Sequence, residues 1–455
     1  MYYGDADNDL EDALLFNVSE MKRGFKNGQR VNLILLFDRP SAGYGCYDRW
    51  GAFNENFNGA RLYRVTSGKT LRLNGGEFFP EITEKSGYVD VNMGDALTLQ
   101  KFIRFCKANF PAEKYALIFT NHGGGPKKKS SLSNSDDKPL YKELCSDYTS
   151  NDSLFTNEIS STLTSDESVD VLGIDACLMS SAEFAYQFRR DSTNSGFSAE
   201  ILVASAFPIW SWGWDYRAIL SRLKGGMTVR QFGMSIFNEE KYSGLTMTQM
   251  SCLDLAKVSA VKEAVDNLAK ELPAYKTQTE NIRGTLSSLN ILHYFDAFEL
   301  GERLYFPFFD LYALAEGIYN STSFNTNTPV KEAALALMTA IDEFIVDSFM
   351  NEDPRDYGSS YPLKYPFKPG RNGVHIVFPD TASLNVNGGY ITSAWSYTKT
   401  WYTYDNNSIR DIFGNILYNK DGDIIGTTGL DWCKPSGNGA GIVGNWLELL
   451  KDWYK

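Results

Sequence analysis

Four short apolar runs, separated by helical patterns, constrain the fold of this chain most strongly. The runs are continuous rather than alternating, which is typical of strands buried on both faces of a sheet. Helices between such strands predict a mainly parallel sheet with helices on both faces, an α/β fold. The runs lie at Val31–Phe37, Tyr115–Thr120, Val169–Ile174 and Ile201–Ala204, and the helical patterns at Asp9–Arg23, Gly94–Asn109, Leu178–Arg190 and Trp214–Leu223.

The character of the sequence changes near residue 260. Leu253–Leu272 and Val330–Phe349 predict long amphipathic helices. Residues 357–432 are rich in Tyr, Trp, Asn, Gly and Pro, with a hairpin signal at Asp421-Gly422. We therefore predict two domains, an α/β domain over residues 1–260 and a C-terminal α+β domain over residues 261–455.

Charge and motif content exclude several classes of function. Lys and Arg number 44 against 56 Asp and Glu, and the net charge of −12 argues against a nucleic-acid partner. There are three histidines and no H-E-x-x-H or C-x-x-C motif, so no His/Cys metal site is expected. No apolar run reaches roughly 18 residues, which argues against a membrane span. The six scattered cysteines neither require nor exclude disulfides.

His122 directly follows the predicted strand Tyr115–Thr120 and precedes three glycines, Gly123 to Gly125. Glycines let backbone N–H groups approach a reacting carbonyl closely, as an oxyanion hole requires. Taken alone, His122 is also compatible with an ordinary polar residue entering a turn. The other histidines, His293 and His375, lie among aromatic or β-branched residues, and we expect them to be structural.

Cys177 occupies the equivalent place after the strand Val169–Ile174. A helical pattern starts at Leu178, and a cysteine at a helix N-terminus is favoured as thiolate by the helix dipole. The alternative is a small buried apolar side chain. Because ligands of such sheets bind beyond the carboxyl ends of the strands, we expect His122 and Cys177 to lie close together as acid/base and nucleophile. Asp175, two residues earlier, adds a carboxylate that could hold a cationic substrate or cap a helix.

Three acidic residues near the start, Asp5, Asp7 and Asp9, follow the spacing of an EF-hand loop. Leu10 replaces the turn glycine and Phe16 the closing glutamate, so these acids are better explained as helix-start residues. The sequence requires no cofactor, and nothing in it supports a need for calcium.

Four segments together resemble the clostripain family of cysteine endopeptidases, which belongs to the clan of caspases, legumains and gingipains. The interval of 55 residues between His122 and Cys177 is similar to the roughly 50 residues of caspases. The resemblance covers about residues 1–260 and implies a caspase-like α/β/α sandwich whose catalytic domain is this region. The segments are Gly4–Met21, Tyr115–Gly125, Leu172–Arg189 and Gly213–Tyr216, and the strand Gly373–Pro379 is similar to one in the family's C-terminal region.

The resemblance implies a Cys177–His122 dyad, with backbone N–H groups of Gly123 and Cys177 receiving the oxyanion. It places Asp175 at the base of the primary specificity pocket, which favours cleavage after Arg or Lys. Ser205 stands in the segment where the family commonly has a further acid. The resemblance also implies a zymogen that cleaves itself between His122 and Cys177. The basic residues in a glycine- and serine-rich stretch there are Lys127, Lys128, Lys129, Lys138 and Lys142.

The substrates expected from the resemblance are proteins or peptides. Residues 1–7 do not form a signal-peptide pattern, but relatives of this kind are exported, so we expect a secreted or envelope-attached bacterial protein with an upstream segment outside this sequence. An esterase, suggested by the His-Gly-Gly-Gly motif, is disfavoured because no G-x-S-x-G motif is present. A catalytically silent surface binding protein of the same fold is the remaining alternative.

Overall fold

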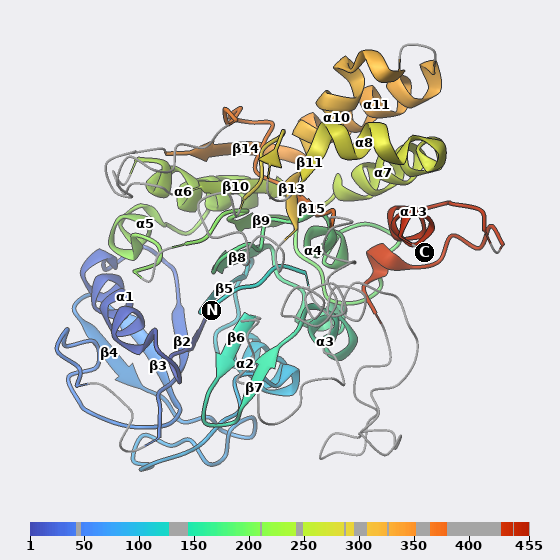
Figure 1. Ribbon diagram of the computed structural model, residues 1–455. Coiled ribbons are helices and arrows are strands. Elements are labelled where there is room, and N and C mark those ends of the chain that lie inside the picture. Colours follow the sequence, from blue (N-terminus) through green and yellow to red (C-terminus); the bar gives the residue numbers. More distant parts are fainter. Residues whose placement is uncertain are drawn as a thin grey trace.

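A computed structural model describes the fold at the level of individual side chains (Figure 1). It describes residues 1–41, 47–126, 144–209, 212–242, 249–285, 288–294, 307–324, 327–351, 365–379, 429–439 and 441–454.

Nine strands of the described chain form one central sheet, in the order β14-β10-β9-β8-β5-β1-β2-β3-β4. The middle strands β9, β8, β5, β1 and β2 are parallel, and the pairs at both edges are antiparallel. All four predicted strands are present in this sheet; β9, β8 and β5 are neighbours, and β1 lies between β5 and β2. The bounds are β1 Tyr2–Asp5, β2 Leu33–Asp38, β3 Arg61–Thr66, β4 Lys69–Arg72, β5 Ala116–Thr120, β8 Val171–Asp175, β9 Ile201–Ala204, β10 Gln249–Asp254 and β14 Ile345–Met350.

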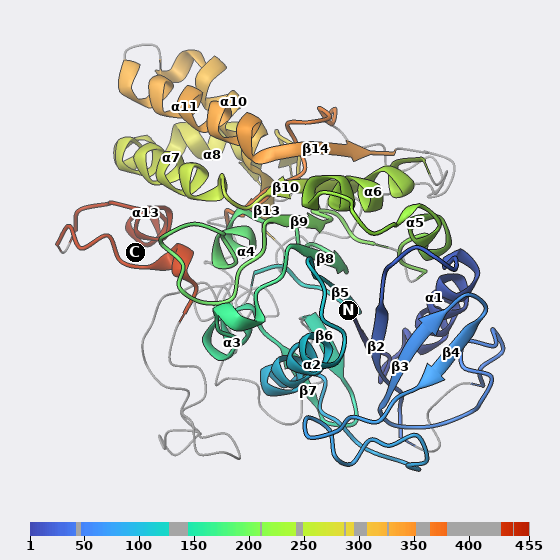
Figure 2. The same ribbon diagram turned by 180° about the vertical axis from the view of Figure 1, so that it is seen from behind.

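Helices cover both faces of the sheet, as Figures 1 and 2 show from opposite sides. The α1, α5 and α6 helices pack on one face and α2, α3, α4 and α7 on the other. Successive residues of a strand point to opposite faces of the sheet. Tyr2 lies in the core between the sheet and α1, α5 and α6, and Tyr3 lies in the core on the other face. The bounds are α1 Glu11–Gly24, α2 Ala96–Asn109, α3 Thr156–Thr162, α4 Ala182–Gln187, α5 Tyr216–Arg222, α6 Val229–Tyr242 and α7 Val258–Glu271.

Further elements complete the described chain. The β6–β7 hairpin stands beside β1 and β5. Within the described residues, no helix is both long and apolar enough to span a bilayer. The bounds are β6 Leu144–Asp147, β7 Asp152–Leu154, α8 Lys276–Arg283, β11 Gly284–Thr285, β12 Ser288–Leu289, β13 Phe308–Asp310, α10 Leu311–Asn320, α11 Thr328–Phe344, β15 His375–Val377 and α13 Trp446–Trp453, with 3-10 turns at Ser165–Glu167, Pro273–Tyr275, Thr322–Phe324 and Asp431–Cys433.

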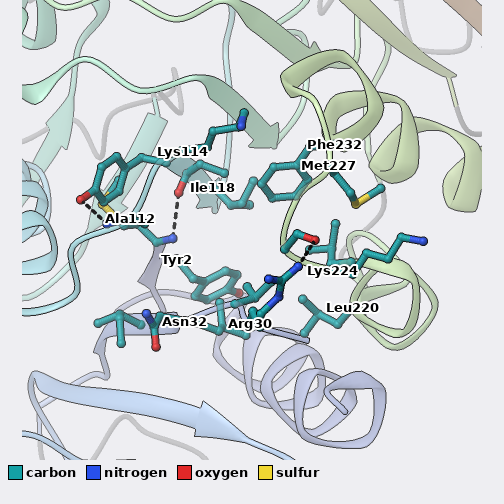
Figure 3. A pocket seen from close by; sticks show the side chains of 18 of the residues that line it. Tyr2, Arg30, Asn32, Ala112, Lys114, Ile118, Leu220, Lys224, Met227 and Phe232 are labelled. Carbon is teal, nitrogen blue, oxygen red and sulfur yellow. Dashed lines mark hydrogen bonds between the residues drawn. The ribbon is translucent and has the colours of Figure 1, made fainter. Parts of the chain in front are cut away.

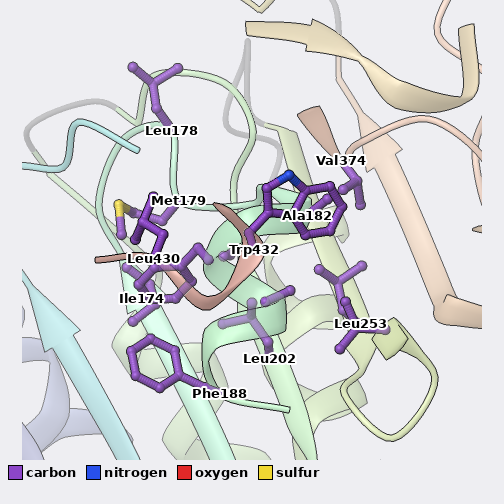
Figure 4. Packing of buried hydrophobic residues seen from close by; sticks show 14 of the residues in the cluster. Ile174, Leu178, Met179, Ala182, Phe188, Leu202, Leu253, Val374, Leu430 and Trp432 are labelled. Carbon is purple, nitrogen blue, oxygen red and sulfur yellow. The ribbon is translucent and has the colours of Figure 1, made fainter. Parts of the chain in front are cut away.

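The chain beyond residue 260 completes the sheet and core of the first half. The predicted boundary falls in the first turn of α7, and β14 pairs with β10 as an edge strand of the central sheet. Leu430 and Trp432 pack beside Ala182 of α4 in the same core (Figure 4). The described residues before and after position 260 therefore share one hydrophobic core.

Two predicted long helices are shorter than their patterns indicate. Leu253–Leu272 contains the end of β10 before α7 begins, and in Val330–Phe349 the helix α11 ends at Phe344, after which the chain continues as β14. Short apolar runs do not distinguish the end of a buried helix from a buried strand. The hairpin expected at Asp421-Gly422 lies outside the described residues.

Candidate functional site

The loops that carry His122 and Cys177 lie against each other. The parallel strands β5 and β8 place Thr120 opposite Asp175. His122 lies two residues after Thr120, and Cys177 lies two residues after Asp175. A Cβ atom added to Gly123 would lie 2.3 Å from the carbonyl oxygen of Cys177 and 3.0 Å from its backbone nitrogen. The close approach of the two backbones thus requires a glycine at position 123.

Cys177 is half-buried, whereas the other cysteines of the described chain are buried and all are free thiols. The backbone N–H of Ile209 donates a hydrogen bond to the Cys177 sulfur over 3.2 Å. Cys177 is therefore the most accessible thiol in the part of the chain that the structure describes.

The helix predicted to start beside Cys177 begins later. The first residue after the cysteine, Leu178, has a φ of 63°, in the left-handed region that non-glycine residues rarely adopt. The Leu178 and Ser180 N–H groups donate to the Phe207 and Ser205 carbonyls, so these residues do not form a first helical turn. The helix α4 starts only at Ala182. The expectation that a helix dipole activates Cys177 is therefore wrong, because the dipole falls off within the first turn.

His375 holds this unusual segment in place. Its Nε2 lies 2.9 Å from the carbonyl oxygen of Leu178, and its ring stacks on Phe308 with 4.2 Å between centroids. Burial lowers the pKa of His375 to about 3, so the ring is neutral, and Nε2 donates its hydrogen to the carbonyl. His375 therefore has a structural role, as predicted: it holds Leu178, the residue that follows the candidate nucleophile Cys177.

His122 has a carboxylate partner. Its Nε2 lies 2.7 Å from Oδ1 of Asp9, and the same oxygen accepts a hydrogen bond from the Tyr148 hydroxyl over 3.0 Å. The Asp9 side chain is 58% exposed, so solvent screens part of this interaction. Asp9 can orient the imidazole and stabilise its protonated form. The sequence assigned Asp9 only to a helix start.

Asn121 fixes the backbone before His122. Its amide nitrogen donates to the carbonyl and the carboxylate of Asp5 over 2.6 and 2.9 Å, and its oxygen accepts from the N–H groups of His122 and Ser146. Asp9 and Asn121 could be recognised as site residues only from the fact that they follow β1 and β5, two strands that end at the same edge of the sheet. Using that fact requires the strand order to be known.

Asp175 is fully buried, and its pKa is raised to about 7 by that burial. Oδ2 accepts hydrogen bonds from the Trp214 N–H over 3.1 Å and the Tyr216 hydroxyl over 2.9 Å. Oδ1 has no hydrogen-bond partner among the described residues. A Cβ on Gly213 would lie 2.5 Å from Oδ2, so the segment that holds Asp175 also depends on a glycine.

Ser205 lies in the interior, where its hydroxyl is 2.8 Å from the Phe207 carbonyl and 3.1 Å from Oε1 of Gln249. Its direct contact with a substrate stays a prediction. The candidate self-cleavage residues fall outside the described chain; these are Lys127, Lys128, Lys129, Lys138 and Lys142.

A cavity of about 410 Å³ lies at the opposite edge of the sheet (Figure 3). Residues around the amino ends of β1, β2 and β5, such as Tyr2, Arg30 and Tyr115, form one part of its wall, and Leu220 of α5 and Phe232 of α6 another. Because His122 and Cys177 follow the carboxyl ends of their strands, this cavity is distinct from the candidate site.

A thiol and an imidazole on adjacent loops at the carboxyl edge of a parallel sheet define a cysteine peptidase of the caspase-like class. The model of the Clostripain family matches residues 2–453. The chain therefore belongs to the clostripain family, and it is a cysteine endopeptidase.

Individual relatives agree with this assignment. Clostripain of Hathewaya histolytica is 37% identical over 495 residues, an alignment that covers 100% of this chain and 86% of that protein. An inactive zymogen C11 protease from Parabacteroides distasonis superposes with a TM-score of 0.56 at 18% identity, covering 88% of this chain and 94% of that one. A secreted C11 cysteine protease from Bacteroides thetaiotaomicron, in complex with an irreversible peptide inhibitor, gives 0.53 at 17% identity, with 88% and 97% covered. At these identities the solved structures show the fold.

Proposed function

We propose that Cys177 is the nucleophile and His122 the general acid and base of this endopeptidase. The observation that carries the proposal is the backbone contact between the two strand-end loops, which brings Gly123 against Cys177. Asp9 supports the proposal because its carboxylate contacts the imidazole directly.

The chemistry follows from these groups. His122 takes the proton of the Cys177 thiol, and the sulfur attacks the peptide carbonyl. The negative charge on the carbonyl oxygen is received by the N–H groups of Gly123 and Cys177. The C–N bond then breaks as His122 gives a proton to the leaving amine, which leaves a thioester. Water, deprotonated by His122, attacks the thioester and releases the carboxylic acid and the thiol.

Covalent labelling tests the catalytic assignment. A peptide acyloxymethyl ketone ending in Arg or Lys should label the protein once, and Cys177→Ala should lose both label and turnover. The matched control is Cys106→Ala, which removes a buried thiol and should leave labelling intact. An unreactive Cys177 in a folded protein would contradict its assignment as the nucleophile.

Cleavage after Arg or Lys is proposed from Asp175. Its Oδ1 is buried without a hydrogen-bond partner in the described chain, and no Lys, Arg or His of the described residues forms an ion pair with it. A cationic substrate side chain would supply the positive partner that no described residue gives to this buried carboxylate. The preference is tested by mass spectrometry of cleaved peptide libraries, and products without Arg or Lys at the new C-terminus would contradict it.

Self-cleavage within residues 127–142 is proposed on the composition of that stretch and on the zymogen form of one relative. Intact-mass analysis should find two fragments for the active protein and one chain for Cys177→Ala.

A secreted or envelope-attached location is proposed because one structural relative is described as secreted. Fractionation of the producing cells would test it.

A further inference from the structure

Two stacked rings from the second half of the chain contact both catalytic loops. The loops are residues 121–125, which follow β5, and residues 176–181, which follow β8. Phe308 opens β13 and His375 opens β15, and these two strands pair in a small antiparallel sheet of their own. The two rings are nearly parallel, at 13°, with 4.2 Å between their centroids. The strand β15 lies beside α4, so the small sheet is next to the loop that carries Cys177 (Figure 1).

The backbone after Cys177 is strained at Leu178. Its φ of 63° lies in the left-handed region, which the Cβ of an ordinary residue makes unfavourable. Such a conformation persists only where its surroundings fix it. The Leu178 N–H donates to the Phe207 carbonyl over 3.3 Å, and the Leu178 carbonyl accepts from Nε2 of His375 over 2.9 Å. These two hydrogen bonds hold the peptide groups on both sides of the Leu178 Cα atom.

The φ angle of Leu178 sets the orientation of the peptide group that joins it to Cys177. The oxygen of that peptide group faces Gly123, since a Cβ built on Gly123 would lie 2.3 Å from it. If Leu178 adopted an ordinary φ, the peptide group would rotate and this contact would change. The N–H groups of Gly123 and Cys177 are the proposed oxyanion donors, so their relative position determines how well the negative charge is stabilised.

The loop that carries His122 rests on the same pair of rings. Gly125 has a φ of 85°, and a Cβ built on it would lie 2.6 Å from Cζ of Phe308 and 3.4 Å from the Leu178 carbonyl oxygen. This loop therefore packs closely on the stacked pair and on the carbonyl that His375 holds. Nδ1 of His375 is buried without a hydrogen-bond partner among the described residues. The orientation of the ring thus depends on the stack with Phe308 and on the bond to Leu178.

We propose that His375 is a positioning residue for the peptidase reaction and that Phe308 holds its ring in place. The Nε2–H group fixes the strained Leu178 and thereby the backbone N–H of Cys177 relative to that of Gly123. The inference rests on the proposed function, because it takes these N–H groups as the oxyanion donors. His375 is 0% exposed and does not touch the substrate, so its loss should slow the chemical step and leave substrate binding unchanged.

The test compares variants that separate the hydrogen bond from the stack. His375→Phe keeps a stacked ring and removes the donor, so kcat should fall by roughly 30-fold or more, with KM changed by less than about twofold. His375→Gln restores an N–H donor and should recover most of the lost rate. The matched control is His293→Phe, at the other buried histidine of the described chain, whose ring packs on Phe309 at 4.8 Å. It should leave kcat within about twofold of the parent value.

A second measurement separates oxyanion stabilisation from the reactivity of the thiol. Iodoacetamide alkylates Cys177 by displacement of iodide at a saturated carbon, so the reaction forms no oxyanion. In His375→Phe the alkylation rate should stay within about threefold of the parent rate while peptide turnover falls. A parallel loss of alkylation and turnover would show that the variant disturbs the whole site, and it would overturn the positioning role.

Failure of this inference is distinguishable from failure of the proposed function. Turnover that survives Cys177→Ala would overturn the dyad. A His375→Phe protein that is folded by circular dichroism and has parental kcat, a His375→Gln rate no better than that of His375→Phe, or an equal loss in His293→Phe would overturn only the role of His375. If His375→Phe does not fold, Phe308→Leu carries the test: it removes the stack and should lower kcat by roughly fivefold or more. Parental kcat in Phe308→Leu would then overturn the proposal.

Discussion

A single buried carboxyl, Asp175, should control how activity on basic substrates depends on pH. Its pKa is raised to about 7 by burial, so the free enzyme carries a proton there at acidic pH and a charge at alkaline pH. Only the ionised form attracts an Arg or Lys side chain. We predict that kcat/KM for Arg-ended reporters rises through about pH 7, measured over a full pH profile.

The control for that profile is Asp175→Asn. The amide cannot ionise, so this contribution to the pH dependence should disappear, and kcat/KM for Arg substrates should fall by roughly 30-fold or more, the effect of removing one partner of a buried charge pair. An unchanged preference for Arg and Lys in the variant would show that another group reads the substrate.

Asp9 should affect the rate more than binding. It contacts the imidazole of His122 but is largely exposed, so Asp9→Asn should lower kcat only by roughly three- to tenfold and leave KM nearly unchanged. Steady-state kinetics would measure the split. Asp12→Asn removes another acid of the same region, one paired with Arg49, and should have no effect; equal losses in both variants would contradict a specific role of Asp9.

The sequence located the candidate dyad but not its partners. His122 and Cys177 were visible because each directly follows a continuous apolar strand, a local pattern. Asp9 and Asn121 were missed because their contacts join segments more than 110 residues apart and depend on β1 lying beside β5. Local patterns show where a strand ends, but not which strand lies next to it.

At the scale of elements, the strands were predictable and the ends of helices less so. The helix after Cys177 was expected at Leu178 but begins at Ala182, because Leu178 and Ser180 bond to the Phe207 and Ser205 carbonyls instead of forming a first turn. Tertiary hydrogen bonds of this kind override local propensity and leave no periodic signal in the sequence.

The contact between the β5 and β8 loops gives a prediction at this scale. Gly123→Ala would place a methyl group 2.3 Å from the Cys177 carbonyl oxygen, so the loops must separate and the proposed oxyanion donors shift. We expect kcat/KM to fall by roughly 100-fold or more while circular dichroism stays unchanged. Gly87→Ala, where nothing lies within 4 Å, should retain full activity, and wild-type rates in Gly123→Ala would exclude this contact as essential.

At the scale of the whole molecule, residues before and after position 260 contribute to one sheet and one core, whereas the sequence predicts two domains. Composition changes near residue 260, but β14 belongs to the central sheet, and Trp432 and Trp446 are fully buried in the core that also contains α4. The sequence could not show this because composition reports local character, whereas sheet membership depends on pairing between β10 and β14 across about 100 residues.

A shared core predicts cooperative unfolding of the described halves. Full-length Cys177→Ala should unfold in one calorimetric transition, and a chain ending at residue 260 should fail to fold, since its edge strand β10 would lose β14 and its core would lose the apolar surface of α11 and α13. Within the intact chain, Trp432→Ala should destabilise the protein by about 3–5 kcal/mol and lower the single transition temperature. Trp212→Ala, at a position that is 46% exposed, should change it little. Two separate transitions, or a soluble and folded fragment 1–260, would instead establish two independent domains.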